Sequence, residues 1–480
     1  MITLIASTLF VLIGSYLFRR FTNRVSPNIP YAGSDSLWDR LKVPVEYGID
    51  PVGFLAKQRE KLGDVFCVDL FLVKIVFFLG SDGNKVVLRA AEDQLSFWEG
   101  LRWLTGGLWD HSLDYLDWPD KSLKSVKLGF LKQDRIIAHG SDTVGLADEY
   151  FAKWSKQGDV PLFHSISYLV TAHLFVIMLG EDFYHKHGQE LIPAMSQFER
   201  DLQHPLLRLL PGALWGWCSA GSRILKSDKR FDQLVRAEVA DIYSNPDKHR
   251  GRTDYLYFTS QLNGLNYIPV YGNHVMSMIF GGHANAAMSI PWMFLHARRV
   301  PGAIELWREE VGLGHDAKKP FLDACFRETA RLYTNVSMMR RTKSAVTVAG
   351  FDLAPGTMVA CSPLASQRNS SVFEKPTSWK PERFLANGAY AEWFQKTEFV
   401  HFGLGQHACP GEKLARLLIF DSILKTWLEK YDVEVVGGLE EGTKGIDGVG
   451  AEAAWTEENF GTPAVRGKDV RVKITKRMPR

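Results

Sequence analysis

The stretch F-G-L-G-Q-H-A-C-P-G, from Phe402 to Gly411, places one of only five cysteines in a loop with three glycines. Pro410 suits the first turn of a helix, and the apolar sequence from 412 to 420 is expected to continue it. Cys409 is therefore predicted at a helix N-terminus, where the helix dipole and free N–H groups stabilise a thiolate. Such a cysteine serves as a metal ligand, as a nucleophile with His407 as its base, or as a buried small residue. The loop alone leaves these alternatives open.

The rest of the composition narrows the class of protein. A length of 480 residues fits roughly two to four average domains or one large enzyme, and 46% hydrophobic residues are ordinary for a globular chain. The net charge of +3 is too small to indicate nucleic-acid binding, so no nucleic-acid partner is expected. The cysteines are odd in number and lack a C-x-x-C pair, which favours a reducing compartment over a disulfide framework. A structural zinc site is not expected either, because only His401, His407 and Cys409 gather near one another.

The first 18 residues, MITLIASTLFVLIGSYLF, carry no charge, and Arg19, Arg20 and Arg24 follow them directly. This length is just sufficient for a helix that spans a bilayer. A cleaved signal peptide would need basic residues before the apolar run, whereas here they lie after it. The positive-inside rule then places the N-terminus in the lumen and the body in the cytosol. We predict a transmembrane anchor over 1–18, a basic linker stiffened by Pro27 and Pro30 over 19–33, and one large domain over 34–480.

The domain is expected to be mainly α with minor β. Helix predominates from about residue 92 to about residue 332. Strands are predicted within 65–80, over 344–362 with turns at Ala349-Gly350 and Pro355-Gly356, and over 431–436 and 470–474. A helix over 270–299 is apolar on nearly every face, which is typical of the deep core of a large protein. At its centre, Gly281 and Gly282 indicate a bend, a close approach to the backbone, or plain helix-on-helix contact.

The spacing Phe402-x-x-Gly405-x-x-x-Cys409-x-Gly411 resembles the haem-thiolate loop of cytochromes P450. The resemblance implies that Cys409 is the axial ligand of a haem b iron and pushes electron density onto it. It also implies that Phe402 packs beside the sulfur. The position usually held by Arg is His407 here, which can still donate to a haem propionate. A second propionate partner is expected at Arg340 or Arg341, and we choose Arg341.

Two further motifs are similar to those of this family. Glu328-Thr329-Ala330-Arg331 matches its E-x-x-R, whose i,i+3 spacing brings the two side chains together on one helix face. Pro381-Glu382-Arg383-Phe384 follows at the family's distance. The resemblance makes Glu328, Arg331 and Arg383 a structural network on the proximal side of the haem. The resemblance to the family covers essentially the whole chain.

The central helix departs from the family pattern. The usual acid–threonine pair is replaced by Ala284 and Asn285, and Asn285 can still hydrogen-bond and hold a water molecule. A second register, with His283 in the place of the acid, is less favoured. The H-A-N sequence resembles the branch that contains the sterol 7α- and 12α-hydroxylases and prostacyclin synthase.

The resemblance implies a monooxygenase of the endoplasmic reticulum membrane, single-pass with its catalytic domain in the cytosol. Its substrate would be a bulky apolar molecule such as a sterol or terpenoid. NADPH–cytochrome P450 reductase would supply the electrons. The alternative is a reductase-independent isomerase or dehydratase that acts on a peroxide. The expected site comprises the catalytic residues Asn285, Gly281 and Gly282, and the cofactor-binding residues Phe402, Gly405, His407, Cys409, Gly411 and Arg341.

Overall fold

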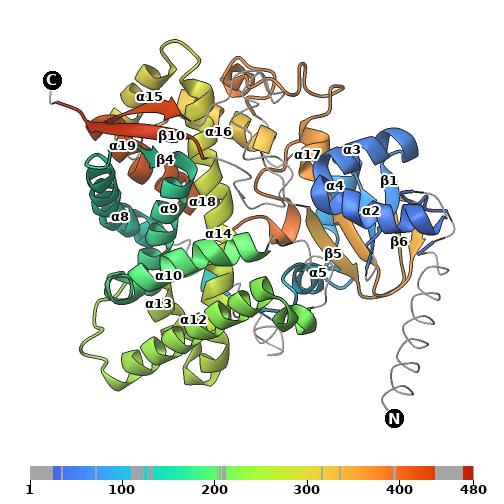
Figure 1. The fold of residues 1–480 in the computed structure, drawn as a ribbon, viewed down its shortest axis with the longest axis horizontal. Helices are drawn as coiled ribbons and strands as arrows, with labels where there is room; N and C mark the ends of the chain where they lie inside the picture. Colours follow the sequence, from blue (N-terminus) through green and yellow to red (C-terminus); the bar gives the residue numbers. More distant parts are fainter. Residues whose placement is uncertain are drawn as a thin grey trace.

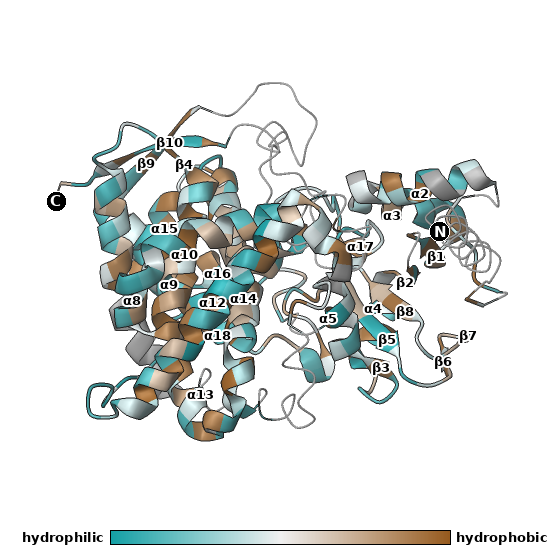
Figure 2. Ribbon diagram, turned by 60° about the horizontal axis from the view of Figure 1, so that its bottom comes forward, coloured by the Kyte–Doolittle hydropathy of each residue, from teal (hydrophilic) through white to brown (hydrophobic). Residues whose placement is uncertain are grey.

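The structure is a computed structural model. It describes residues 25–26, 28–33, 36–70, 73–109, 121, 124–126, 129, 133–202, 204, 207, 212–314, 317–333, 337–392, 396–437 and 469–478. The predicted anchor over 1–18 lies outside these residues. In Figures 1 and 2 a helical region occupies one side of the molecule and a region built on a β-sheet occupies the other.

The helices confirm the mainly α class. The longer helices are α2 (Leu37–Ile49), α3 (Pro51–Leu62), α4 (Gly80–Arg89), α5 (Phe97–Leu104), α8 (Gln133–Trp154), α9 (Leu162–Leu179), α10 (Glu181–Leu202), α12 (Ser219–Ser244), α13 (Tyr255–Asn263), α14 (Ile268–Ala297), α15 (Ala303–Gly312) and α16 (Pro320–Tyr333). The shorter ones are η2 (Gly212–Trp217), η3 (Leu265–Tyr267), α17 (Pro363–Gln367), η4 (Pro381–Phe384), η5 (Gly405–His407), α18 (Glu412–Arg416), the π-helical η6 (Leu417–Leu424) and α19 (Lys425–Lys430).

The strands are β1 (Val65–Asp69), β2 (Lys74–Phe78), β3 (Leu95–Ser96), β4 (Val160–Pro161), β5 (Met338–Thr342), β6 (Val346–Val348), β7 (Phe351–Leu353), β8 (Met358–Cys361), β9 (Tyr431–Gly437) and β10 (Arg471–Lys476). Seven of the strands, β1, β2 and β6 to β10, lie in or at the ranges that the β-branched and aromatic runs predicted, whereas β3, β4 and β5 were not predicted. One sheet has the order β1-β2-β8-β5-β3, with β2 and β8 parallel and its other pairs antiparallel. A second sheet has the order β4-β10-β9, and β6 pairs with β7.

Helix α14 is the central element of the helical region. It packs against α9, α12 and α16, and its large side chains Tyr271 and Trp292 are buried. This confirms the prediction of a helix in the deep core. Helix α9 is long and apolar enough to cross a membrane, but 83% of it is buried inside the protein, as expected of a core helix.

The end of the predicted linker belongs to the body of the protein. Ile29 and Ala32 are buried. The Ala32 N–H donates to the Cys67 carbonyl oxygen at 2.8 Å, and the Cys67 N–H donates to the Pro30 carbonyl oxygen at 2.8 Å. These bonds place the segment beside β1, so we place the start of the body at or before Ile29 instead of at residue 34.

Candidate functional site

The loop from Phe402 to Gly411 is a compact, hydrogen-bonded turn. The Cys409 N–H donates to the Phe402 carbonyl oxygen at 2.7 Å. Gly403 and Gly405 adopt φ angles of 76° and 72°, in the left-handed region that favours glycine. A Cβ atom on Gly405 would lie 2.5 Å from the Leu88 carbonyl oxygen. The glycines therefore allow the loop to bend sharply and to lie against the end of α4.

Cys409 is exposed, although protein surrounds much of its side chain. Burial raises the pKa of its thiol, the Gly411 N–H hydrogen bond lowers it, and the Glu412 carboxylate raises it. Cys409 precedes Gly411, the N-cap of α18, by two residues, and burial as the largest effect leaves its pKa above the usual value. Cys409 is thus accessible, with one backbone N–H directed at its sulfur.

The middle of α14 presents a second open surface. Within α14, which the structure describes in full, the exposed residues are Gly281, Gly282 and Asn285. Gly281 and Asn285 are four residues apart and share a helix face. A Cβ atom on Gly281 would have nothing within 4 Å, so the glycine borders empty space. This excludes tight helix-on-helix contact as the reason for Gly281.

The loop and α14 lie close together. Helix α18 is beside α14 in both views, and η6, which continues α18, contacts α14 (Figures 1 and 2). The side-chain amide of Asn285 has no hydrogen-bond partner among the described residues, and its backbone carbonyl accepts from the Ser289 hydroxyl at 2.7 Å. Asn285 is therefore available to a molecule that enters this space.

His283 points away from the open surface. Its side chain is buried, and its two ring nitrogens contact the Glu199 carboxylate in α10 and Ser167 in α9. The second register, with His283 in the place of the acid, thus receives no support from the structure. Ala284 is also buried. Helix α14 contains no Asp or Glu, so no acidic group of this helix borders its open face.

His407 contacts a carboxylate and two aromatic rings that the sequence did not predict. Its Nε2 donates to the Glu92 carboxylate at 2.8 Å, and its ring stacks on Phe97 with centroids 4.5 Å apart. Although burial opposes ionisation of Glu92, hydrogen bonds from His407, Ser96 and the Phe97 N–H lower its pKa to about 2. His407 and Glu92 are 315 residues apart in the chain, so no local motif signals the pair.

The two candidate arginines of β5 point in different directions, as neighbours on a strand do. Arg341 is exposed and lies 3.8 Å from Glu99. Arg340 is buried, and its guanidinium carbon lies 5.0 Å from the centroid of the Phe97 ring that also stacks on His407. Arg340 therefore shares the Phe97 ring with His407, whereas the predicted Arg341 lies on the surface.

The predicted structural network is present. Arg331 and Glu328 are fully buried and share two hydrogen bonds of 2.8 Å. The Arg383 Nε donates to the same carboxylate at 3.3 Å. Arg331 also donates to three backbone carbonyl oxygens, those of Gln367, Pro376 and Ser378. The network ties α16 to the segments that precede the cysteine loop.

These observations fit a haem group. Cys409 offers a sulfur ligand with an N–H directed at it, and the Cβ position of Gly281 in α14 has no neighbour within 4 Å. Hydrogen-bonding side chains for carboxylate groups are available at His407 and at the Arg340 guanidinium.

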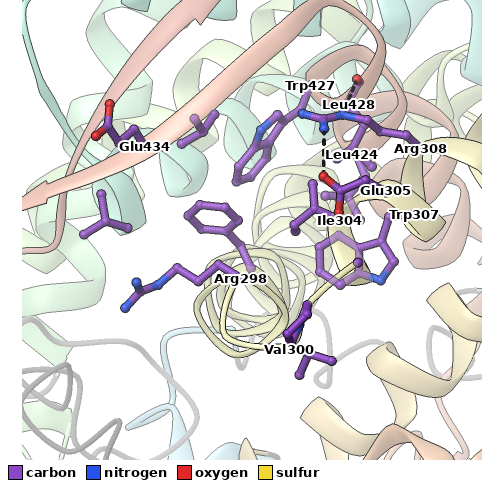
Figure 3. Close-up of a pocket in the computed structure, with 15 residues that line it drawn as sticks. Arg298, Val300, Ile304, Glu305, Trp307, Arg308, Leu424, Trp427, Leu428 and Glu434 are labelled. Carbon is purple, nitrogen blue, oxygen red and sulfur yellow. Dashed lines mark hydrogen bonds and ion pairs between the residues drawn. The ribbon is translucent and has the colours of Figure 1, made fainter.

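A separate pocket of about 380 Å³ lies between the end of α14, α15, α19 and β9 (Figure 3). Phe294, Trp307 and Trp427 line it, and Arg308 pairs with Glu305 at 3.7 Å in its wall. None of the predicted site residues lines this pocket, so we do not assign the chemistry to it.

Comparisons with known proteins agree with the geometry. The family model described as "Cytochrome P450" matches residues 142–447. The chain is 30% identical to the cytochrome P450 monooxygenase pyvB of Aspergillus violaceofuscus, over 80% of this chain and 79% of that protein. It is 25% identical to the lanosterol 14-alpha demethylase of Bos taurus, over 91% of this chain and 89% of that protein. The fold matches a retinoic-acid-bound cyanobacterial CYP120A1 with a TM-score of 0.74 and 17% identity, over 94% of this chain and 100% of that one.

Proposed function

This chain belongs to the cytochrome P450 family and is an oxidoreductase of the monooxygenase type, and from that premise we propose that it oxidises a bulky apolar substrate. The substrate class we propose is a sterol, a terpenoid or a related secondary metabolite. The oxidation would consume dioxygen and electrons from a reductase partner.

The position of Cys409 carries this proposal. Cys409 is exposed, and so are Gly281, Gly282 and Asn285 of the central helix α14, which lies beside α18 in Figure 1. Bound haem supplies the iron centre at which dioxygen is activated. Cys409 would ligate that iron, and the Gly411 N–H would stabilise its thiolate. Phe402 and Gly405 shape the loop around the ligand.

The other side chains would hold and orient the reactants. We propose that His407 and Arg340 bind the haem propionates, with Arg340 replacing our sequence-based choice of Arg341. Asn285 would hold a water molecule or the substrate through its amide, since neither Asn285 nor Ala284 supplies a carboxylate. Glu328, Arg331 and Arg383 stabilise the fold near the loop and take no part in the chemistry.

The substrate, the electron source and the location are inferred from the relatives and from the sequence. A named relative, lanosterol 14-alpha demethylase, acts on a sterol, which supports a rigid apolar substrate. We propose NADPH–cytochrome P450 reductase as the partner and the endoplasmic reticulum membrane as the location. The predicted anchor over 1–18 would hold the domain there, facing the cytosol.

The alternative is a reductase-independent isomerase or dehydratase that acts on a peroxide. It is motivated by Ala284 and Asn285, which replace the usual acid–threonine pair. The named relatives reported above are monooxygenases and demethylases, which favours the oxygenase. The resemblance to the sterol 7α- and 12α-hydroxylase and prostacyclin synthase branch rests on short motifs such as His283-Ala284-Asn285 and stays a prediction.

The deciding experiment is incubation of membranes that contain the full chain with a metabolite extract, followed by untargeted product analysis. The arms are with and without reductase, NADPH and dioxygen, and Cys409→Ala is the matched control. We expect products that require all three components and Cys409. Products formed from a lipid peroxide without reductase would instead establish the isomerase.

A further inference from the structure

Gln367, the last residue of α17, is a fully buried amide that joins two parts of the protein. Its Oε1 accepts from the Val400 N–H at 3.0 Å. Its Nε2 donates to the Arg331 carbonyl oxygen at 3.1 Å and lies 3.5 Å from the Ala330 carbonyl oxygen. One side chain therefore connects the end of α16 with the segment that enters the cysteine loop.

The end of α16 holds Gln367 from more than one side. The last four carbonyl groups of a helix have no partner within the helix, and in α16 these include the carbonyl group of Arg331. While Gln367 donates to that oxygen, Arg331 Nη1 donates to the Gln367 carbonyl oxygen at 2.7 Å. The next residue, Arg368, donates to the Leu332 carbonyl oxygen. Gln367 and Arg331 thus exchange hydrogen bonds in both directions, and the buried Glu328–Arg331 pair fixes the position of the amide.

At its other end the contact reaches the turn that carries Cys409. Val400 is buried, and its carbonyl oxygen accepts from the Gly403 N–H at 3.0 Å. The Phe402 carbonyl oxygen accepts in turn from the Cys409 N–H at 2.7 Å. A buried N–H group that loses its partner costs free energy, so Val400 stays where Gln367 can accept from it. A shift of Val400 would be passed through these two bonds to Cys409.

The contact requires an amide of this length. The Val400 N–H can only donate and the carbonyl oxygens of α16 can only accept, so the side chain must offer an acceptor and a donor together. A glutamine does this without a buried charge. An ionised glutamate offers acceptors only, a methionine lacks an N–H donor, and an asparagine is one methylene group shorter.

Resting on the haem assignment proposed above, we propose that Gln367 is a positioning residue for Cys409. Its amide fixes Val400 relative to α16, and the turn from Val400 to Cys409 then holds the sulfur in the place where it ligates iron. Gln367 acts through Val400 and takes no direct part in the chemistry.

The test compares the wild-type full chain with Gln367→Met, Gln367→Asn and the control Tyr243→Phe. Tyr243 in α12 donates to the Ser260 carbonyl oxygen in α13 at 2.7 Å, so the control also removes a bond from a side chain to a backbone carbonyl group. The measurements are amide hydrogen exchange over residues 399–411 and the rate at which the ferrous carbon monoxide complex loses its thiolate band. Each variant is measured equally far below its own thermal unfolding midpoint, so that a difference reflects the loop and not overall stability.

We expect amide exchange over 399–411 to be about tenfold faster in Gln367→Met than in the wild type, because the Val400 N–H loses its buried acceptor. The thiolate band should also disappear about tenfold faster, as when an outer contact that orients a metal ligand is removed. Tyr243→Phe should match the wild type in both measurements.

Exchange and band-loss rates in Gln367→Met that equal those of Tyr243→Phe would overturn the proposal. Faster exchange with an unchanged band-loss rate would overturn it as well, since Val400 would then move without moving Cys409. Should Gln367→Met fail to fold, Gln367→Asn decides by the same assays, because it keeps a buried amide that is too short to reach both partners. Failure of the haem assignment is distinguishable, because the wild type itself would then lack the thiolate band.

Discussion

The imidazole of His283 in α14 and the carboxylate of Glu199 in α10 form a hydrogen-bonded ion pair inside the helical region. On the other side of the ring, Nε2 lies 3.0 Å from the Ser167 hydroxyl and 3.1 Å from the Ser167 carbonyl oxygen in α9. Burial disfavours the imidazolium, but the Glu199 carboxylate and the hydrogen bonds outweigh it and raise the pKa of His283. Three helices are therefore joined beside Gly282, at the edge of the open face.

Removal of one member of this pair should destabilise the protein. We expect Glu199→Gln to lower the free energy of unfolding by about 3 kcal/mol, because it leaves a buried imidazole without its anion. The matched control is Glu190→Gln, which breaks an ion pair between α10 and α12 whose two side chains are each 49% exposed. That change should cost less than about 1 kcal/mol. Urea unfolding followed by circular dichroism measures both, and equal losses would contradict the assigned role of the buried pair.

The contribution of this pair should also depend on pH. Because folding raises the pKa of His283 above its unfolded value, its stabilisation is fully present below the unfolded pKa of about 6.5. It is lost as the pH rises through the higher folded-state pKa. We therefore expect the difference in unfolding free energy between wild type and His283→Gln to shrink as the pH increases over that window. A difference that grows with pH would show that the ring is neutral in the folded protein.

Cys409 should be indispensable for the spectral signature of the enzyme. We expect Cys409→Ala to abolish the thiolate band of the ferrous carbon monoxide complex, because the axial sulfur is lost. Cys218→Ala serves as the control, since Cys218 is half-buried at the start of α12, far along the chain from the loop. A thiolate band that survives in Cys409→Ala would refute the ligand assignment.

Two glycine substitutions should separate stability from turnover. Gly405→Ala should lower the free energy of unfolding by about 2 kcal/mol or more, because it combines a φ of 72° with a Cβ atom 2.5 Å from the Leu88 carbonyl oxygen.

Gly281→Ala should leave the free energy of unfolding unchanged or raise it by up to about 1 kcal/mol, since a methyl group there meets nothing within 4 Å and alanine favours helices. The new methyl group should nonetheless slow product formation by entering the open face. Thermal unfolding and product analysis of both variants check this, and an unchanged rate in Gly281→Ala would place the substrate elsewhere.

Asn285 should influence how efficiently electrons reach the product. We expect Asn285→Thr to raise the ratio of product to NADPH consumed by up to about fivefold, which corresponds to one hydrogen bond of about 1 kcal/mol. Ser277→Ala is the control, because that hydroxyl lies two turns away and donates to the His274 carbonyl oxygen at 2.7 Å. An identical ratio of product to NADPH consumed in wild type and Asn285→Thr would mean that Asn285 takes no part in proton delivery.

The sequence by itself determined the features that depend on local spacing. Strands such as β1 and β2 follow from runs of β-branched and aromatic residues, and Glu328 and Arg331 meet because their spacing places them on one helix face. The loop from Phe402 to Gly411 could likewise be recognised from its glycines and its cysteine. In each case the interacting groups are separated by only a few residues, so the backbone geometry brings them together.

Only the tertiary structure decided which of several nearby side chains face the site. Arg340 and Arg341 are neighbours in sequence, and the packing of β5 against α5 turned Arg340 inward and left Arg341 on the surface. His283 was a candidate acid until its contacts with α9 and α10 fixed its direction. Glu92 reaches His407 across 315 residues. Contacts of this kind depend on how distant elements pack. The energy of that packing is spread over the whole chain and is not contained in any short motif.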